Sequence, residues 1–468
     1  MTLEALLEAL PPEDRPRARL ALRALVCTFT PDEPLDALAL DLRIADCDAR
    51  LFAQLDALLH HPAVQSLEST WRSLALVTAR IDTAENIRLE ILHCPRRDLA
   101  DDLREAPEIA RSGLYQHVYA RAIGTHGAAP YGLVCADFDL GPDLEDIHLL
   151  RQCAAVAAIA HAPFVANAGP RLFDLPDLTG LPRLRDLPAA LAGPRLRAWQ
   201  ALRACDDARN VGLCLPRFLL RAPYDVHSDP STPLAYRERA GPDPADFLWG
   251  RASYLFAILA AGSFARHRWC VHLLGAAAAG GAGLLAWDHA SLPGLWHRHP
   301  FECRLTGRLE RALADEGLIP FVYDRSAGRA RLHAAPSVQR PPAASHPGEH
   351  LGAQLPYMFL VARLAHYLKC VQRERIGGWL DRGALQRELE SWLRQYVSDQ
   401  DDAQPEVRAR RPLRRAAVAV EPVAGQGGWY RCHLQLQPHL SHNSTSFTLA
   451  LFGKLDRPVG DAPPEATP

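Results

Sequence analysis

The chain has 468 residues, of which 48% are hydrophobic and 23% charged, which are ordinary values for a globular protein of more than one domain. Its net charge of −2 argues against nucleic acid or an anionic membrane as the main partner, and no apolar run reaches the roughly 18 residues that would insert into a bilayer. The 11 cysteines are scattered singly and the N-terminus lacks the pattern of a secretory signal, so we expect free thiols and a cytoplasmic location.

Residues 1–60 are predicted to form helices joined by proline-containing breaks. In the first helix Leu3, Leu6, Leu7 and Leu10 share one face. A second helix is predicted over residues 17–27. The third and strongest helix carries an apolar stripe made by Ile44, Leu51, Phe52, Leu55, Leu58 and Leu59. A ten-residue amphipathic helix is marginal alone in water, so the first helix must dock on its own chain or on another one, and both alternatives stay open.

Residues 61–345 have the pattern of a mixed α/β region. Residues 87–92 alternate like a half-buried strand, whereas the apolar runs at residues 131–136 and 211–215 are typical of inner strands. Buried helices are predicted over residues 149–162 and 246–264. Four prolines within residues 334–350 indicate a linker, which places a domain boundary near residue 345.

Residues 346–468 begin with two long predicted helices, over residues 355–373 and 380–396. Residues 416–423 and 429–437 then alternate as two strands around a glycine-rich turn, and residues 447–451 alternate likewise. In the second strand the side chains that face one side are those of Tyr430, Cys432, Leu434 and Leu436. A two-stranded ribbon is marginal alone, so these strands need a further strand or a packed helix.

No group of residues has the spacing of an active site, a cofactor site or a metal site. The glycine-rich stretch at residues 275–281 lacks the lysine and the serine or threonine of a phosphate loop. Cys135 has no histidine at a catalytic spacing, and His161 and His366 are predicted to be hydrogen-bonded core histidines. Three candidate metal ligands lack a closing cluster: His297, His299 and Cys303. We therefore expect no cofactor, no metal and no enzymatic activity.

A cluster of arginines precedes the first C-terminal strand. Its members are Arg408, Arg410, Arg411 and Arg414. Like charges at this density favour an acidic surface of a protein partner, and a phosphate site is the alternative.

Several motifs occur in a fixed order along the chain. The stretch at residues 209–224 includes Val211-Gly212-Leu213-Cys214-Leu215-Pro216, and Phe247-Leu248-Trp249-Gly250 follows it. Earlier motifs are His61-Pro62, Trp71-Arg72-Ser73-Leu74, Ser112-Gly113-Leu114-Tyr115, Pro130-Tyr131-Gly132-Leu133 and Ala160-His161-Ala162-Pro163-Phe164. Later motifs are Gln354-Leu355-Pro356-Tyr357-Met358, Arg363-Leu364-Ala365-His366-Tyr367, Gln372-Arg373-Glu374 and Arg411-Pro412-Leu413-Arg414. Over roughly residues 50 to 455 this order resembles the large subunit of the contractile sheath of bacterial type VI secretion systems, the TssC/VipB family.

The resemblance implies a structural protein that works in a polymer. Its expected partners are a small sheath subunit (TssB/VipA type), copies of itself, an inner-tube protein (Hcp type) and an AAA+ unfoldase (ClpV type) that recycles contracted sheath. Strands donated between chains would join neighbouring subunits. By position, the C-terminal strands are the candidates for this exchange, with the interface residues Val418, Val420, Trp429, Tyr430, Leu434 and Leu436. The helix that carries Leu3, Leu6, Leu7 and Leu10 is the candidate for unfoldase binding.

The expected fold is a multi-domain mixed α/β (α+β) chain with a core like that of phage tail sheaths. Its predicted domains are N-terminal helices and an arm at residues 1–60, a core at residues 61–345, and helices with a β-hairpin at residues 346–468. A sheath-related adaptor or baseplate-type protein that does not polymerise is the alternative function, because it would share the absence of chemistry. An α/β enzyme is a third reading.

Overall fold

The computed structural model describes most of the chain, in fourteen stretches. They are residues 11–12, 14–26, 37–125, 127–225, 235–241, 243–274, 285–286, 299–324, 329–342, 347–374, 382–398, 404–422, 430–439 and 449–454. The contacts divide the chain into two compact units. One unit is Met1–His61 with Tyr224–Arg239, and the other is Pro62–Pro223 with Ala240–Pro468. The domain boundary predicted near residue 345 stays a prediction.

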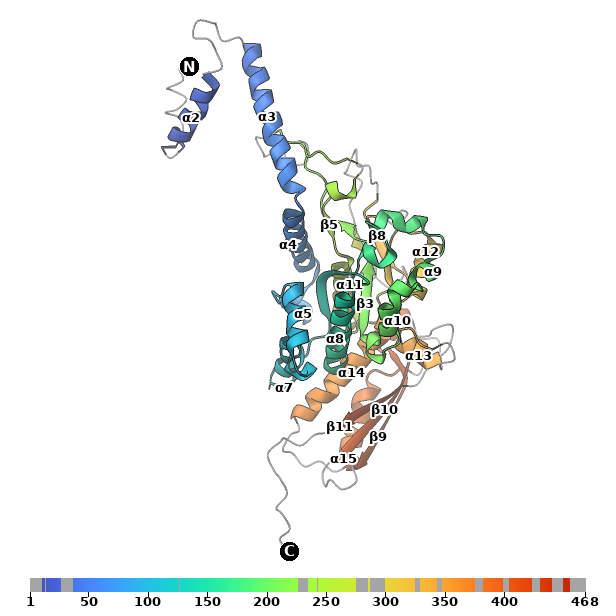
Figure 1. Ribbon diagram of the computed structural model, residues 1–468. Helices are drawn as coiled ribbons and strands as arrows, with labels where there is room; N and C mark the ends of the chain where they lie inside the picture. Colours follow the sequence, from blue (N-terminus) through green and yellow to red (C-terminus); the bar gives the residue numbers. More distant parts are fainter. Residues whose placement is uncertain are drawn as a thin grey trace. The chain divides into compact units, whose positions relative to one another are not determined.

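The helices and strands carry the labels of Figure 1. The helices are α2 (Arg15–Val26), α3 (Ala37–Leu59), α4 (Pro62–Arg80), α5 (Arg96–Glu105), α6 (Gly113–Tyr115), α7 (Arg121–Gly124), α8 (Leu144–Ala160), α9 (Leu187–Leu191), α10 (Arg197–Arg203), α11 (Ala252–His267), α12 (Gly307–Asp315), α13 (Pro347–Gly352), α14 (Leu355–Glu374), α15 (Arg382–Arg394) and α16 (Pro405–Arg410). The strands are β1 (Val134–Leu140), β2 (Phe164–Ala168), β3 (Val211–Leu215), β4 (Phe218–Leu219), β5 (Trp249–Gly250), β6 (Leu285–Ala286), β7 (Ile319–Asp324), β8 (Arg329–Leu332), β9 (Leu413–Pro422), β10 (Tyr430–Pro438) and β11 (Leu449–Lys454).

In the first unit, the carboxyl-terminal end of α3 packs on residues 235–239. The rings of Phe52 and Tyr236 meet edge to face at 5.4 Å, and Asp56 accepts a hydrogen bond from the Tyr236 hydroxyl at 2.6 Å. Ile44 and Leu58, on the predicted apolar stripe, are exposed. The stripe is therefore only partly covered by the described residues of its own unit, and the first predicted helix lies outside the described residues.

A six-stranded sheet forms the centre of the second unit, in the order β1-β2-β3-β7-β8-β6. The first four strands are parallel and the last two are antiparallel to their neighbours. Side chains alternate between the two faces of a strand. In β3, accordingly, Leu213 and Leu215 belong to one buried cluster and Cys214 to another. Helices α8, α10 and α12 supply the first cluster, and α4, α11 and the start of α14 supply the second (Figure 1).

The prediction for residues 211–215 is confirmed, and three other local predictions need correction. Residues 87–92 form no strand. The strand predicted at residues 131–136 begins at Val134 and lies at the end of the sheet rather than inside it. The predicted linker is partly core: Ala335 and Val338 are fully buried, and the Val338 N–H donates to the Val211 carbonyl at 2.9 Å. Proline interrupts the regular hydrogen bonding of a β-sheet, but a proline-containing stretch can still be buried when the neighbouring backbone N–H groups form hydrogen bonds.

The two motif stretches around Leu213 and Trp249 meet in space. After β3, residues Phe218 and Leu219 pair as β4 with Gly250 and Trp249 of β5. A Cβ on Gly250 would lie 2.7 Å from the Phe218 ring, so glycine allows this close approach.

Helix α14 caps the carboxyl ends of two core helices. His366 Nε2 lies 2.7 Å from the carbonyl oxygen of Ala160, the last residue of α8, and Lys369 Nζ donates at 3.2 Å to the carbonyl one residue earlier. Arg373 Nη1 donates to the carbonyl of Ile123 in α7 at 3.1 Å. The last carbonyls of a helix lack intrahelical partners and carry partial negative charge. These contacts therefore hold α14 on the core, and the prediction of a hydrogen-bonded His366 is confirmed.

We expect the free energy of unfolding to fall as the pH drops below about 6.5. Burial lowers the pKa of His366 from its ordinary value of 6.5 to about 4, and burial lowers the pKa of His161 to about 3. As the pH falls through 6.5 the unfolded chain therefore binds protons that the folded chain does not, and stability is lost. For His366 alone the loss is about 2 kcal/mol between neutral pH and about pH 4.5.

Chemical denaturation of the full chain across this pH range measures that loss. The variant His366→Gln keeps an N–H donor for the Ala160 carbonyl but cannot titrate, so its pH dependence should be flatter. An equal slope in wild type and variant would contradict the assignment.

Candidate assembly site

The C-terminal sheet is the first candidate site for assembly. It has three antiparallel strands in the order β11-β10-β9, with Val418 opposite Leu434 and Ala416 opposite Leu436. The predicted alternation is correct: Cys432, Leu434 and Leu436 are buried. The third strand, β11, pairs with β10 over residues 449–454, so the sheet has the further strand that its sequence required.

The apolar face of this sheet is covered by its own chain. Four predicted interface residues are buried among side chains of α14 and α15: Val418, Val420, Leu434 and Leu436. Helix α15 lies on this face with Leu385, Leu389 and Leu393, which recur at helical spacing. The four side chains therefore pack against helices of their own chain. Trp429 lies outside the described residues, and the side chain of Tyr430 in β10 is not described. An interface role for the sheet itself stays a prediction.

The arginine cluster is divided between two environments. Arg410 and Arg411 are exposed at the end of α16, whereas Arg408 and Arg414 are half-buried. Burial, followed by the positive charge of Arg408 and then of Arg414, lowers the pKa of the neighbouring His439. Arg410 and Arg411 are therefore the members that present charge to solvent.

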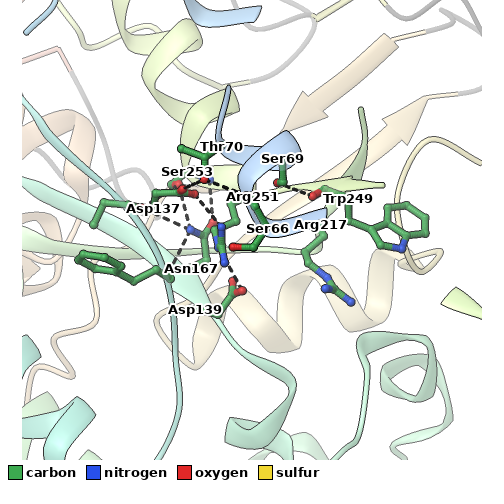
Figure 2. A network of polar contacts seen from close by, with 12 residues as sticks. Ser66, Ser69, Thr70, Asp137, Asp139, Asn167, Arg217, Trp249, Arg251 and Ser253 are labelled. Atoms are coloured by element: carbon green, nitrogen blue, oxygen red, sulfur yellow. Dashed lines mark hydrogen bonds and ion pairs between the residues drawn. The ribbon is translucent and has the colours of Figure 1, made fainter. Parts of the chain in front are cut away.

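A polar network joins α4, the edge of the central sheet and the start of α11 (Figure 2). Arg251 donates to Asp137 at 2.8 Å and to Asp139 at 3.1 Å, and both carboxylates stand on β1. Thr70 of α4 donates to the other oxygen of Asp137 at 2.5 Å. Burial alone would lower the pKa of Arg251, but the charges of Asp139 and Asp137 raise it above its ordinary value. The guanidinium is therefore charged and fixed.

An amide completes the network on the next strand. Asn167 of β2 donates to Ser253 Oγ at 2.9 Å, and its carbonyl oxygen accepts from the Ser253 N–H at 2.8 Å. From α4, Ser69 donates to the Trp249 carbonyl at 2.7 Å. These bonds connect the α4 and Trp249 motif regions to the sheet, so the network is a structural joint.

The groups that resemble chemistry in the sequence are engaged or unreactive. Burial raises the pKa of the Cys135 thiol to about 12, which leaves it protonated and non-nucleophilic. His299 Nδ1 lies 3.3 Å from the Phe301 N–H, and His297 lies outside the described residues. Within the described ranges no group of three or more His, Cys, Asp or Glu side chains could hold a metal ion.

Sequence analysis missed the Arg251 network. A signal for it existed: Asp137 and Asp139 alternate along a strand whose neighbours are apolar, and partly buried carboxylates require a cation or hydrogen-bond donors. That the cation is Arg251, more than 100 residues later, could be known only from the fold.

Two family models match the chain in succession. The EvpB/VC_A0108 tail sheath N-terminal domain (VipB) matches residues 41–339, and the EvpB/VC_A0108 tail sheath gpW/gp25-like domain (VipB_2) matches residues 344–455. The chain belongs to this tail sheath family. It is also 32% identical, over 422 residues, to the type VI secretion system sheath protein TssC1 of Pseudomonas aeruginosa, an alignment that covers 88% of this chain and 85% of TssC1.

A solved structure is also similar to this tail sheath protein. It is the sheath tail protein from Desulfitobacterium hafniense, with 11% sequence identity and a TM-score of 0.33. The alignment covers 68% of this chain and about half, 56%, of that chain.

The family models place their junction between residues 339 and 344, in the proline-containing stretch that follows Val338. In this sheath protein α14 and the C-terminal sheet therefore belong to the gpW/gp25-like part, and the central sheet to the N-terminal part. None of the helices that the structure describes is long and apolar enough to cross a membrane.

Proposed function

We propose that this protein is the large subunit of the contractile sheath of a type VI secretion system. The observation that carries the proposal is that both tail sheath models match in order, over residues 41–339 and 344–455. In this role the chain polymerises with a small sheath subunit (TssB/VipA type) and with copies of itself around an inner tube of Hcp type. Contraction of the polymer then propels the tube.

The polar chemistry of the described core supports a structural role without catalysis. Arg251 pairs with Asp137 and Asp139, and Arg217 forms two 2.7 Å hydrogen bonds to Glu302. Such groups are satisfied by one another rather than directed at a substrate. The ten cysteines described are free thiols, which supports a cytoplasmic location.

Assembly would use the edges of the C-terminal sheet. β9 and β11 are its outer strands, and outer strands accept strands from other chains through backbone hydrogen bonds. The proposed interface is therefore the strand edges together with Trp429 and Tyr430, rather than the four buried side chains. An AAA+ unfoldase of ClpV type would bind the predicted helix that carries Leu3, Leu6, Leu7 and Leu10.

Electron microscopy of the full chain co-expressed with a small sheath subunit of TssB/VipA type tests the function. Hollow tubules that shorten to a contracted form are expected. A soluble complex that forms no tubules at any concentration would favour the adaptor alternative, because only polymer formation separates the two functions.

We expect the exposed side chains of Arg410 and Arg411 to contribute to assembly. The double variant Arg410→Glu/Arg411→Glu should reduce tubule formation at least about tenfold, because like charges then oppose an acidic partner surface. Its free energy of unfolding should change by less than about 1 kcal/mol, because the side chains are exposed.

Arg151→Glu is the matched control, an exposed arginine on α8, and should assemble as wild type does. Tubule yield is scored by sedimentation at low and high salt. Equal yields for the double variant and the control would remove the arginines from the interface.

A further inference from the structure

A run of exposed apolar residues lies between α4 and α5. Residues 87–95 form no helix, turn or bend, so the backbone runs extended. Leu89, Ile91 and Leu92 are 41%, 66% and 52% exposed. Scattered apolar side chains on a surface are ordinary, but three within four residues of extended chain are characteristic of an interaction site.

The backbone of this run has no backbone partner in the described chain. None of the N–H and C=O groups of residues 87–94 forms a backbone–backbone hydrogen bond there. An extended segment with apolar side chains, whose backbone donors and acceptors have no backbone partner among the described residues, is a template for pairing with a strand of another chain.

The run is nevertheless held in place. Ile87 packs against the cluster that contains Val77 and Leu255, and the Tyr131 hydroxyl donates to the Glu90 carboxylate. Tyr131 leads into β1, the end strand of the central sheet. A segment fixed at this position loses less conformational entropy when a strand binds it, because its conformation is already set.

Two partners are considered for this run, a second copy of the same chain and the small sheath subunit, and the sequence of the run helps to choose between them. Ile87-Arg88-Leu89-Glu90-Ile91 is symmetric about Leu89, so two copies could pair antiparallel with Arg88 opposite Glu90 twice. That pairing is a two-fold contact, which closes a dimer. A helical polymer grows through contacts that are not two-fold, so self-pairing at this strand would compete with sheath growth.

We propose that residues 87–92 are the docking strand for the small sheath subunit, which adds a β-strand of its own to them. The bound strand would carry apolar residues opposite Leu89 and Ile91, an acidic residue opposite Arg88 and a basic residue opposite Glu90. Occupation by the small subunit also prevents the two-fold pairing of copies. The inference rests on the proposed function, because that function supplies the occupant.

Hydrogen exchange of the co-expressed complex of the full chain and the small subunit tests the strand directly. Alternate amides within residues 87–94 should exchange at least about a hundredfold more slowly than those of a synthetic peptide of the same sequence, because a strand added at one edge accepts hydrogen bonds from every second N–H. Rapid exchange of these amides in the complex would overturn the inference.

A capture assay on the tagged small subunit supplies a second measurement. Ile91→Pro removes a strand donor at an exposed position and should reduce the captured chain at least about tenfold. Leu144→Pro is the matched control: Leu144 is an exposed leucine at the first position of α8, where proline is tolerated, and it should be captured as wild type is.

The outcomes separate this inference from the proposed function. Tubules together with unprotected residues 87–94 and normal capture of Ile91→Pro would overturn the inference alone. Protection that Ile91→Pro abolishes, without tubules, would support the inference and overturn the sheath function. No complex with the small subunit would overturn both. A dimer of the chain alone that Ile91→Pro dissolves, with unchanged capture, would assign the strand to a second copy and overturn the inference.

Discussion

Replacing Arg251 with methionine should lower the free energy of unfolding by about 2–4 kcal/mol and abolish tubules under conditions where the wild type assembles. The substitution leaves Asp137 and Asp139 facing each other without the cation that now lies 2.8 and 3.1 Å from them. The Arg251 side chain is 20% exposed and the two carboxylates 23% and 32%, so the expected loss lies below that for a fully buried pair.

Two further variants sharpen this expectation. Arg251→Lys should lower the free energy of unfolding by less than Arg251→Met does, because an ammonium keeps the positive charge. Some loss remains, because an ammonium lacks the guanidinium fork that reaches both carboxylates. Adding Asp137→Asn and Asp139→Asn to Arg251→Met should recover stability, because no unpaired charge remains. Urea denaturation of the full chain measures all three, and a loss below about 0.5 kcal/mol for Arg251→Met would show that the ion pairs are structurally unimportant.

Replacing Gly317 with valine should cost about 3 kcal/mol or more, because two separate penalties act at this position. Gly317 has a φ of +75°, which a β-branched side chain rarely adopts. A Cβ there would also lie 2.9 Å from the carbonyl oxygen of Ser337 and 3.2 Å from that of Val338. Those carbonyls belong to the buried stretch that hydrogen-bonds to β3, so they cannot move away freely.

Helix α12, which ends two residues before Gly317, offers a control for this substitution. Gly307 begins α12, and a Cβ added to it would have no heavy atom within 4 Å, so Gly307→Ala should be neutral or slightly stabilising. Thermal denaturation should therefore separate the two variants clearly. Similar melting temperatures would mean that the turn after α12 adapts, against the geometry described.

Hydrophobic periodicity correctly predicted those elements that can be recognised without knowing which other element packs on them. Residues 211–215 were expected as an inner strand and are β3, and alternation in β10 correctly separated the buried Leu434 from the exposed Gln435. Periodicity states that one face is covered but not what covers it. For the C-terminal strands the sequence therefore left open whether a further strand or a helix packs on them, and both are present: β11 pairs with β10, and α15 lies on the apolar face.

The local predictions that were wrong or missed share one cause: they depend on a partner that is distant in the sequence. Residues 87–92 alternate like a strand, but the described chain provides no strand to pair with them. Residues 335–338 are next to several prolines and were predicted to be a linker, yet their amides donate to β3 and to the carbonyl of Ala353, the residue after α13. The ion pair of Arg251 with Asp137 joins positions more than 100 residues apart, which no local pattern can reveal.

The way α14 is attached has a mechanical consequence. Its first turn is embedded in the core through Leu355 and Phe359, and its later turns hold the ends of α8 and α7 through His366 and Arg373. A rod clamped near both ends transmits a load instead of bending under it. In a contracting sheath, a pull on the C-terminal sheet would therefore be passed through α14 to the central sheet, and the change in length would arise in the sliding of whole subunits past one another.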